Sequence, residues 1–188
     1  MKNPLFLGLL ALFLMPLLSA CSKNNYAKDA YERKDVAALT RMAEAGEPIA
    51  QYSLGNMYRK GEVIAENPEM AVSWYHKSAD QGYAEAQVNL GIMYYSGSGV
   101  TKDRLTAATL WSKAADQGNA MAMMKMGLIY YTGEVVEKNY VLAYKWFTIS
   151  EKLGYRPARW ARGDLATKMT KTQISEASLL VERWRSKN

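Results

Sequence analysis

Apolar residues recur along this chain at the spacing of α-helices, and the whole pattern is repeated. Ala50, Leu54, Met57 and Tyr58 stand at positions i, i+4, i+7 and i+8, which line one face of a helix. Equivalent residues return after each step of 36 residues, and three copies keep this register without an insertion. A fixed period of this length predicts a stack of structural repeats.

Each unit predicts two helices joined by a loop, as its second copy illustrates. Gly97 stands where the first helix would end, a place that favours a left-handed residue. Asp103 follows where a side chain would cap the second helix. Gly91 lies inside the apolar face, although glycine there costs about 1 kcal/mol of helix propensity, and its recurrence predicts close approach of the partner helix. One hairpin cannot bury its apolar face alone, so neighbouring hairpins are expected to stack.

The repeated motifs resemble the Sel-one-like repeat (SLR), a relative of the tetratricopeptide repeat that is 36 residues long. The runs that carry the resemblance are AEAQVNLGIMYYSGSGVTKD and AVSWYHKSADQG, and the match covers residues 46–154. The resemblance implies an all-α fold, a right-handed α-solenoid of helix-turn-helix repeats. It also implies a role in protein–protein contact.

Both ends of the repeat array are predicted to be degenerate caps. In the tail, Thr170 and Gln173 have the spacing of a capping box and would open a last helix. The predicted parts are a lipoprotein signal peptide (1–20), a lipidated tether (21–25), an N-terminal half repeat (26–46), three full repeats (47–82, 83–118 and 119–154) and C-terminal capping helices (155–188).

The beginning of the chain is predicted to be a targeting segment. Lys2 gives a positive start, and residues 5–18 are almost entirely apolar but too short for a membrane span of about 20 residues. The segment ends in Leu-Ser-Ala-Cys at Cys21, which resembles the lipobox of bacterial lipoproteins. An ordinary signal peptide with a chance cysteine is the alternative.

Cys21 is the only cysteine, so the chain forms no internal disulfide. The lipobox resemblance implies that Cys21 carries the lipid anchor, palmitate included. Ser22 follows it, which by resemblance to the enterobacterial sorting pattern indicates the outer membrane. The expected location is therefore the periplasmic face of that membrane.

The positive charge of the chain is concentrated in its tail. Residues 155–188 hold eight Lys or Arg against three Asp or Glu, whereas residues 21–154 hold fifteen of each. Arg156, Arg159 and Arg162 recur there at helical spacing, which predicts a basic patch for anionic lipid headgroups, an acidic partner or a polysaccharide. A merely solvated helix face is the alternative. Nucleic acid is not expected as a partner of an exported chain.

The resemblance also implies that the first helix of each repeat lines a concave groove. These positions are mixed in the first repeat but mostly apolar or aromatic in the second and third, as suits a bound helix or extended peptide. The alternative is that the C-terminal helix folds back and covers this stripe. The predicted groove residues are Tyr52, Val88, Ile92, Tyr95, Met121, Met124, Leu128 and Tyr131.

We expect no enzymatic activity, no cofactor and no metal site. His76 is the only histidine, and no nucleophile with an adjacent base recurs in the sequence. The methionines between Met121 and Met126 have thioethers that suit Cu(I), but they coincide with core and groove positions. The favoured function is an adaptor or scaffold of the bacterial cell envelope that binds an envelope protein or peptide.

Two other functions stay open on the resemblance. A cysteine-rich branch of SLR proteins is described as penicillin-binding, which suggests a hydrolase or binding protein for β-lactams or peptidoglycan. That branch staples each repeat with a cysteine pair, and this chain has none. Some SLR lipoproteins assist exopolysaccharide secretion, and such an accessory role is the third possibility.

Overall fold

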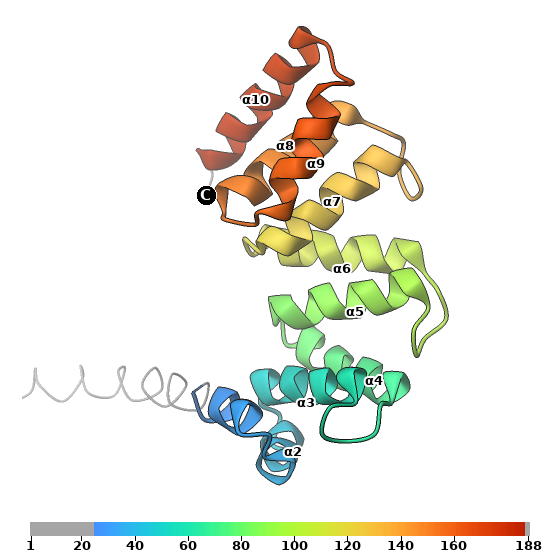
Figure 1. The fold of residues 1–188 in the computed structure, drawn as a ribbon, viewed down its shortest axis with the longest axis vertical. Helices are drawn as coiled ribbons and strands as arrows, with labels where there is room; N and C mark the ends of the chain where they lie inside the picture. Colours follow the sequence, from blue (N-terminus) through green and yellow to red (C-terminus); the bar gives the residue numbers. More distant parts are fainter. Residues whose placement is uncertain (1–24, 187–188) are drawn as a thin grey trace, which may run out of the picture. The chain divides into compact units, whose positions relative to one another are not determined.

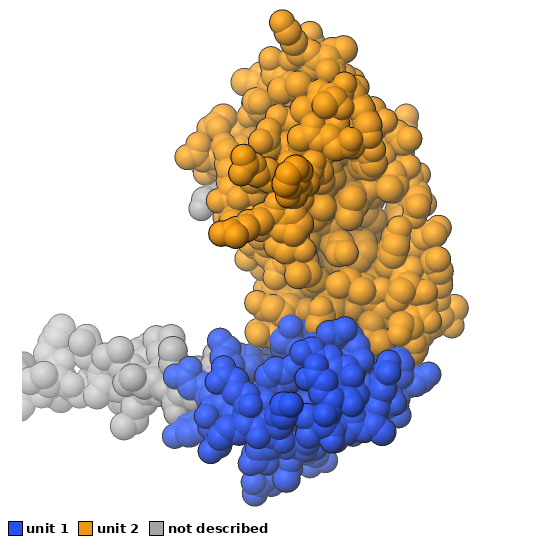
Figure 2. Space-filling view, viewed as in Figure 1, with its two compact units in different colours: residues 1–78 blue, residues 79–188 orange. Residues whose placement is uncertain are grey.

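The computed structural model describes residues 25–186, which form α-helices joined by loops without any β-strand (Figure 1). The chain divides into two compact units, residues 1–78 and 79–188, which Figure 2 colours separately. The predicted lipidation residue, Cys21, lies outside the described residues. Within residues 25–186, no helix combines the length and the apolar character that crossing a membrane requires.

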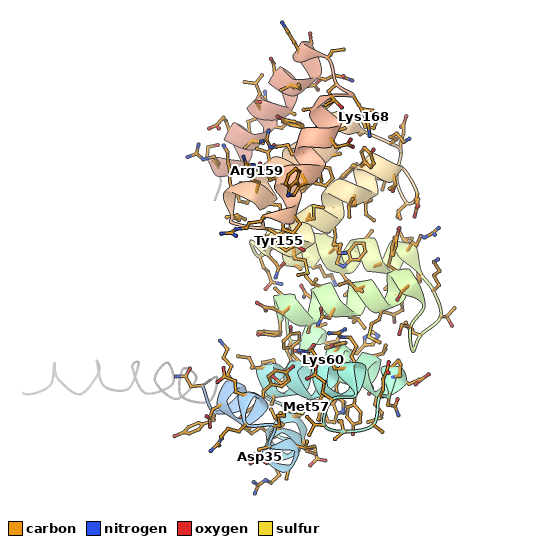
Figure 3. All side chains as sticks on the ribbon, in the orientation of Figure 1. Asp35, Met57, Lys60, Tyr155, Arg159 and Lys168 are labelled. Atoms are coloured by element: carbon orange, nitrogen blue, oxygen red, sulfur yellow. The ribbon has the colours of Figure 1, made fainter. Side chains whose placement is uncertain are left out.

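In the first unit, a helix over residues 25–32 precedes the first repeat hairpin. Asp35 then caps the next helix, because its carboxylate accepts the N–H of Ala38 at 2.9 Å (Figure 3). The core of this unit holds the fully buried side chains of Leu39, Leu54 and Tyr75. The labelled helices are α2 (Val36–Glu44), α3 (Pro48–Lys60) and α4 (Pro68–Asp80), whose last two residues belong to the second unit.

The second unit contains the second and third repeat hairpins and the tail. One core cluster joins Trp111, Met123, Ile149 and Val181, which come from four different helices. The stacked hairpins therefore share one core, as the repeat pattern predicts. The helices of this unit are α5 (Ala84–Ser96), α6 (Arg104–Asp116), α7 (Ala120–Thr132), α8 (Tyr140–Lys152), α9 (Pro157–Ala166) and α10 (Lys171–Arg185).

The loop inside each hairpin is closed by the residues that the sequence marked. Gly97 ends α5 with a φ of 80°, a left-handed conformation, and its N–H donates to the Met93 carbonyl at 2.8 Å. The Asp103 carboxylate accepts the N–H groups of Leu105 and Thr106, each at 3.0 Å. The Thr106 hydroxyl also donates to Asp103 Oδ2 at 2.7 Å, and this bond is the largest cause of the lowered pKa of Asp103, ahead of the N–H bonds. The predicted glycine stop and aspartate cap are both confirmed.

The glycine inside each first helix meets an aromatic ring of the second helix. A Cβ at Gly91 would overlap the Trp111 indole, and one at Gly127 would overlap the Phe147 ring. At Gly55 it would lie 2.7 Å from Tyr75 Cε1. The predicted close approach is confirmed, and its cause is an aromatic side chain packed against a bare helix backbone.

The tail forms two helices that both pack on α8. Thr170 and Gln173 form the predicted capping box at the start of α10, with the Gln173 N–H donating to Thr170 Oγ1 at 3.2 Å. Ala177 and Val181, on the inner face of that helix, are buried. Together with the repeat hairpins, these elements confirm the all-α solenoid class.

Candidate functional site

A pocket of about 100 Å³ lies in the second unit between the second and third repeats. Its walls come from α5, α6, α7 and the loop that follows α7. Three of the predicted groove residues, Ile92, Tyr95 and Leu128, meet there. The complete lining is Ile92, Tyr95, Trp111, Lys125, Leu128, Ile129, Thr132, Glu134 and Val135.

Trp111 forms a rigid wall of this pocket. Its side chain is 3% exposed and packs on the bare backbone at Gly91. The indole Nε1–H donates to the Val88 carbonyl at 3.1 Å, so the polar atom of the ring is satisfied inside the hairpin. Tyr95 lies beside it, with ring centroids 5.5 Å apart. Both aromatic rings are therefore held in place before any partner binds.

The rim of the pocket is polar. The Tyr95 hydroxyl donates to Glu134 Oε2 at 2.8 Å, and Arg104 Nε lies 3.4 Å from the same oxygen. The Glu134 bond is the main cause of a raised pKa of Tyr95, and burial adds to it. Because Arg104 and Tyr95 both engage the Glu134 carboxylate, its charge is balanced within the rim.

Lys125 is a pocket residue that the sequence analysis did not single out. Its ammonium lies 5.7 Å from the Trp111 ring centroid, and burial lowers its pKa. No ion pair of Lys125 occurs among residues 25–186. A signal was present in the sequence, because Lys125 is the only charged residue of α7, Ala120–Thr132.

Val88 does not line a groove, contrary to the prediction. Its side chain is 2% exposed and belongs to the core cluster around Trp111. The reason is that α6 packs on α5 here, with the Trp111 indole donating to the Val88 carbonyl and both residues lying in one core cluster. Tyr52, in the first unit, is half-buried against Tyr75 with ring centroids 6.0 Å apart.

The tail contacts part of the predicted stripe in the third repeat. Met124, Leu128 and Tyr131 pack against a cluster that contains Leu165 of α9 and a buried alanine of α10. Lys168, just beyond α9, donates to the Tyr131 hydroxyl at 2.6 Å (Figure 3). The tail and the predicted stripe therefore meet at Tyr131.

Met121, near the start of α7, is 36% exposed. The part of the stripe that forms a cavity is the pocket at Ile92, Tyr95 and Leu128.

The structure separates Arg162 from the other two arginines of the predicted basic patch. Arg162 Nε lies 2.6 Å from Glu151 Oε2, and its guanidinium also donates to the Tyr144 hydroxyl at 3.0 Å. Arg162 follows the repeat position of a core residue, which is why it turns inward. Arg159, on α9 (Figure 3), and Arg156, which precedes the first residue of α9, remain exposed. Trp160, next to Arg159 in the sequence, is 81% exposed.

Known proteins share both the repeat and the fold. The sequence profile of the Sel1 repeat matches residues 48–83, 84–119 and 120–155, each one residue later than the predicted repeats. A search of curated proteins returned no match. The structure is similar to that of a Sel1 repeat protein from Oxalobacter formigenes, with a TM-score of 0.68 and 34% identity over 75% of this chain and 58% of that one.

A second similar structure is that of c5321, a protective antigen of uropathogenic Escherichia coli strains that displays an SLR fold. The TM-score is 0.54, with 29% identity over 88% of this chain and 45% of that one. This chain thus spans less than two thirds of the length of either protein. Since the three matched repeats make up more than half of its sequence, the chain belongs to the Sel1 repeat family.

Proposed function

We propose that this protein is a non-enzymatic adaptor that holds a peptide segment of a protein partner in the pocket between α5, α6 and α7. Sel1 repeat proteins generally mediate protein–protein interaction. The observation that carries the proposal is the form of the pocket, in which Tyr95 and Trp111 are fixed beside an apolar cavity. Buried aromatic and apolar anchors of this kind dominate the energy of protein interfaces.

The size of the pocket favours a protein partner over a small-molecule substrate. Its volume of about 100 Å³ is well below the roughly 300–1,000 Å³ of typical small-molecule sites. A cavity of this size accepts one side chain, while the rest of a peptide lies across the neighbouring helix surface. Such a site suits recognition of a larger chain by one anchor residue.

Site-specific photocrosslinking in living cells tests this function. A benzophenone amino acid at Thr132, on the pocket wall, is expected to trap a discrete partner. The same group at Leu179, a residue of α10 that is 62% exposed, serves as the control. The crosslink from position 132 should disappear when Tyr95→Ala and Leu128→Ala are combined. An undiminished crosslink in that double variant would reject the pocket as the site.

We place this adaptor at the periplasmic face of the outer membrane, anchored through lipid on Cys21. The support is the lipobox-like Leu-Ser-Ala-Cys sequence and the serine that follows it. Cys21→Ser is expected to leave an unprocessed or soluble chain, and globomycin should block processing of the wild type. Normal maturation of the Cys21→Ser chain at the same bond would exclude the anchor.

The exposed surface of α9 supports a second contact, with anionic lipid headgroups. Trp160 is the kind of side chain that settles at a membrane–water interface, and Arg156 and Arg159 flank it. Each arginine near an anionic membrane contributes about 1 kcal/mol of attraction. The Cys21→Ser chain should bind to vesicles of phosphatidylglycerol. This binding should be lost when Arg156→Gln and Arg159→Gln are added to it. Equal binding to phosphatidylcholine vesicles would contradict this contact.

A further inference from the structure

Lys125 gives the pocket a positive charge that forms no ion pair with any residue between 25 and 186. It lies in α7 and lines the mainly apolar pocket, with its ammonium 5.7 Å from the Trp111 ring centroid. Partial burial makes the ammonium harder to charge, which is why its pKa is lowered. A partly desolvated cation gains most from a carboxylate that arrives with a partner and completes an ion pair. The unpaired ammonium of Lys125 therefore makes the pocket favour a negatively charged partner.

At the opposite end of the pocket, the charged group is already paired. Glu134 follows α7, and its carboxylate is already engaged by Tyr95 and Arg104. From Lys125 to Thr132 the helix rises about 10 Å, so the free cation and the balanced acid lie at different ends of the wall. An acidic side chain of a bound peptide is therefore favoured near Lys125 and finds no unpaired cation near Glu134.

The spacing along α7 sets the distance between the two recognised groups. Ile129 lies one helical turn beyond Lys125, which is a rise of about 6 Å. In an extended peptide, side chains two residues apart point to the same face and are about 6.7 Å apart. If a peptide residue has its aliphatic side chain in the cavity, the side chain two residues along the peptide therefore lies beside Lys125.

The volume of the cavity restricts the anchor. At about 100 Å³, it is smaller than the roughly 150 Å³ cavity that accommodates benzene in an engineered protein core. Leucine, isoleucine, valine or methionine suits it better than an aromatic side chain. The two rings of the wall, Tyr95 and Trp111, supply the contact surface for this aliphatic group.

We infer that the pocket recognises an extended acidic peptide of the partner, with an aliphatic side chain in the cavity and an Asp or Glu two residues away paired with Lys125. The inference rests on the proposed adaptor function and specifies the chemistry of its ligand. It assigns Lys125 as the residue that determines charge specificity. Leu128, Tyr95 and Trp111 contribute the apolar part of the affinity.

Selection from a phage-displayed library of random linear peptides tests the assignment. The purified full chain is compared with Lys125→Met, which keeps an unbranched side chain but removes the ammonium, and with Lys125→Glu. Lys145→Met is the matched control, because Lys145 is also half-buried, lies 4.2 Å from a tryptophan ring centroid and has a pKa lowered by burial. Thermal melts by circular dichroism establish that each variant is folded.

The wild type and Lys145→Met are expected to enrich the aliphatic–acidic pair. Lys125→Met should keep the aliphatic preference and lose the acidic one, and Lys125→Glu should select Lys or Arg at the same peptide position. For a synthetic peptide from the wild-type selection, Asp→Asn or Glu→Gln should weaken binding at least about tenfold. The same peptide substitution should have little effect on binding to Lys125→Met. This comparison tests the role of Lys125 even if Lys125→Glu does not fold.

Other outcomes overturn the inference in distinguishable ways. An acidic preference that persists in Lys125→Met, or binding that is lost when the peptide C-terminus is amidated, would exclude an internal carboxylate on Lys125. If selected peptides ignore Lys125 but are lost in the Tyr95→Ala, Leu128→Ala double variant, the inference fails and the adaptor function stands. Peptides insensitive to both changes, or no enrichment at all, would overturn both.

Discussion

Tyr75 in the first repeat and Trp111 in the second pack on equivalent glycines, but their surroundings differ. The Tyr75 hydroxyl donates to Asn56 Oδ1 at 2.7 Å and accepts a hydrogen bond from Arg59 Nε at 3.3 Å. The residues 36 positions after Asn56 and Arg59 are Ile92 and Tyr95. There the buried polar network is replaced by the apolar wall of a pocket.

The difference shows which features hold the repeat and which are free to specialise. The contact between a helix glycine and an aromatic ring occurs in both hairpins, with different rings. The neighbouring positions carry an amide and a guanidinium group in the first repeat, Asn56 and Arg59, and an isoleucine and a tyrosine in the second. A few substitutions therefore convert a satisfied structural network into a candidate binding site without a change of fold.

The shared glycine contact is expected to give the largest effect. Gly91→Leu should destabilise the second unit by about 1–3 kcal/mol, because the new side chain overlaps the Trp111 ring. Gly163→Leu is the control, since a Cβ at Gly163 meets nothing within 4 Å and leucine is the better helix former. Denaturant unfolding measures both. Equal stability of Gly91→Leu and the wild type would show that the contact between the helix glycine and the aromatic ring does not hold the repeat together.

These contacts were predictable from the sequence to different degrees. The glycine stops, the Asp103 cap and the close contact at Gly91 depend on local chemistry that the sequence repeats three times, so all three were predicted. Val88 was misplaced because helical spacing shows that a face is apolar but not which neighbour covers it, and Val88 lies in the core cluster with Trp111. Lys125 was missed because a lysine on a helix normally faces water.

The C-terminal part shows the same limit. Arg162 was assigned to a surface patch from its charge, yet it occupies the place of a core residue in a degenerate repeat. Its position depends on an acceptor, Glu151, in the preceding helix, and on the Tyr144 hydroxyl. Such long-range partners carry no periodic signal, so sequence spacing alone does not reveal them.

Replacing pocket residues of the second repeat by their equivalents from the first tests whether the pocket binds a partner. Ile92→Asn, Tyr95→Arg and Trp111→Tyr together should rebuild the polar network of the first repeat and remove the pocket. Loss of the aromatic anchors is expected to cost about 2 kcal/mol of binding, roughly thirtyfold, for the partner or a selected peptide. A melt by circular dichroism checks the fold. Unchanged affinity in a folded triple variant would show that the pocket is not the binding surface.

Removing one hydroxyl probes the network of the first repeat alone. Tyr75→Phe should destabilise the chain by about 1 kcal/mol or more, because the buried Asn56 carbonyl loses the hydrogen bond from the Tyr75 hydroxyl. Denaturant unfolding of this variant gives the value, with Tyr58→Phe, at a half-buried residue of the same repeat, as the control. A neutral Tyr75→Phe would mean that the network does not stabilise the first repeat.

The same substitution in the second repeat is expected to have the smallest effect on stability. Tyr95→Phe removes a hydrogen bond to Glu134 at the exposed rim, where water replaces the lost donor. We expect a change within about 0.5 kcal/mol in the free energy of unfolding. A loss as large as that of Tyr75→Phe would erase the distinction between a structural network and an open rim.

The pH dependence of this rim bond sharpens that test. The hydrogen bond to Glu134 raises the pKa of Tyr95, because it stabilises the protonated phenol in the folded chain. Its stabilising effect is therefore complete below the ordinary phenol pKa of about 10 and is lost as pH rises through the raised value. The difference between the ultraviolet titrations of the wild type and Tyr95→Phe isolates this group, and Glu134→Gln should shift its midpoint downward. An unshifted midpoint in Glu134→Gln would show that Glu134 does not hold the Tyr95 hydroxyl in solution, leaving the phenol of the rim free to bond to a partner.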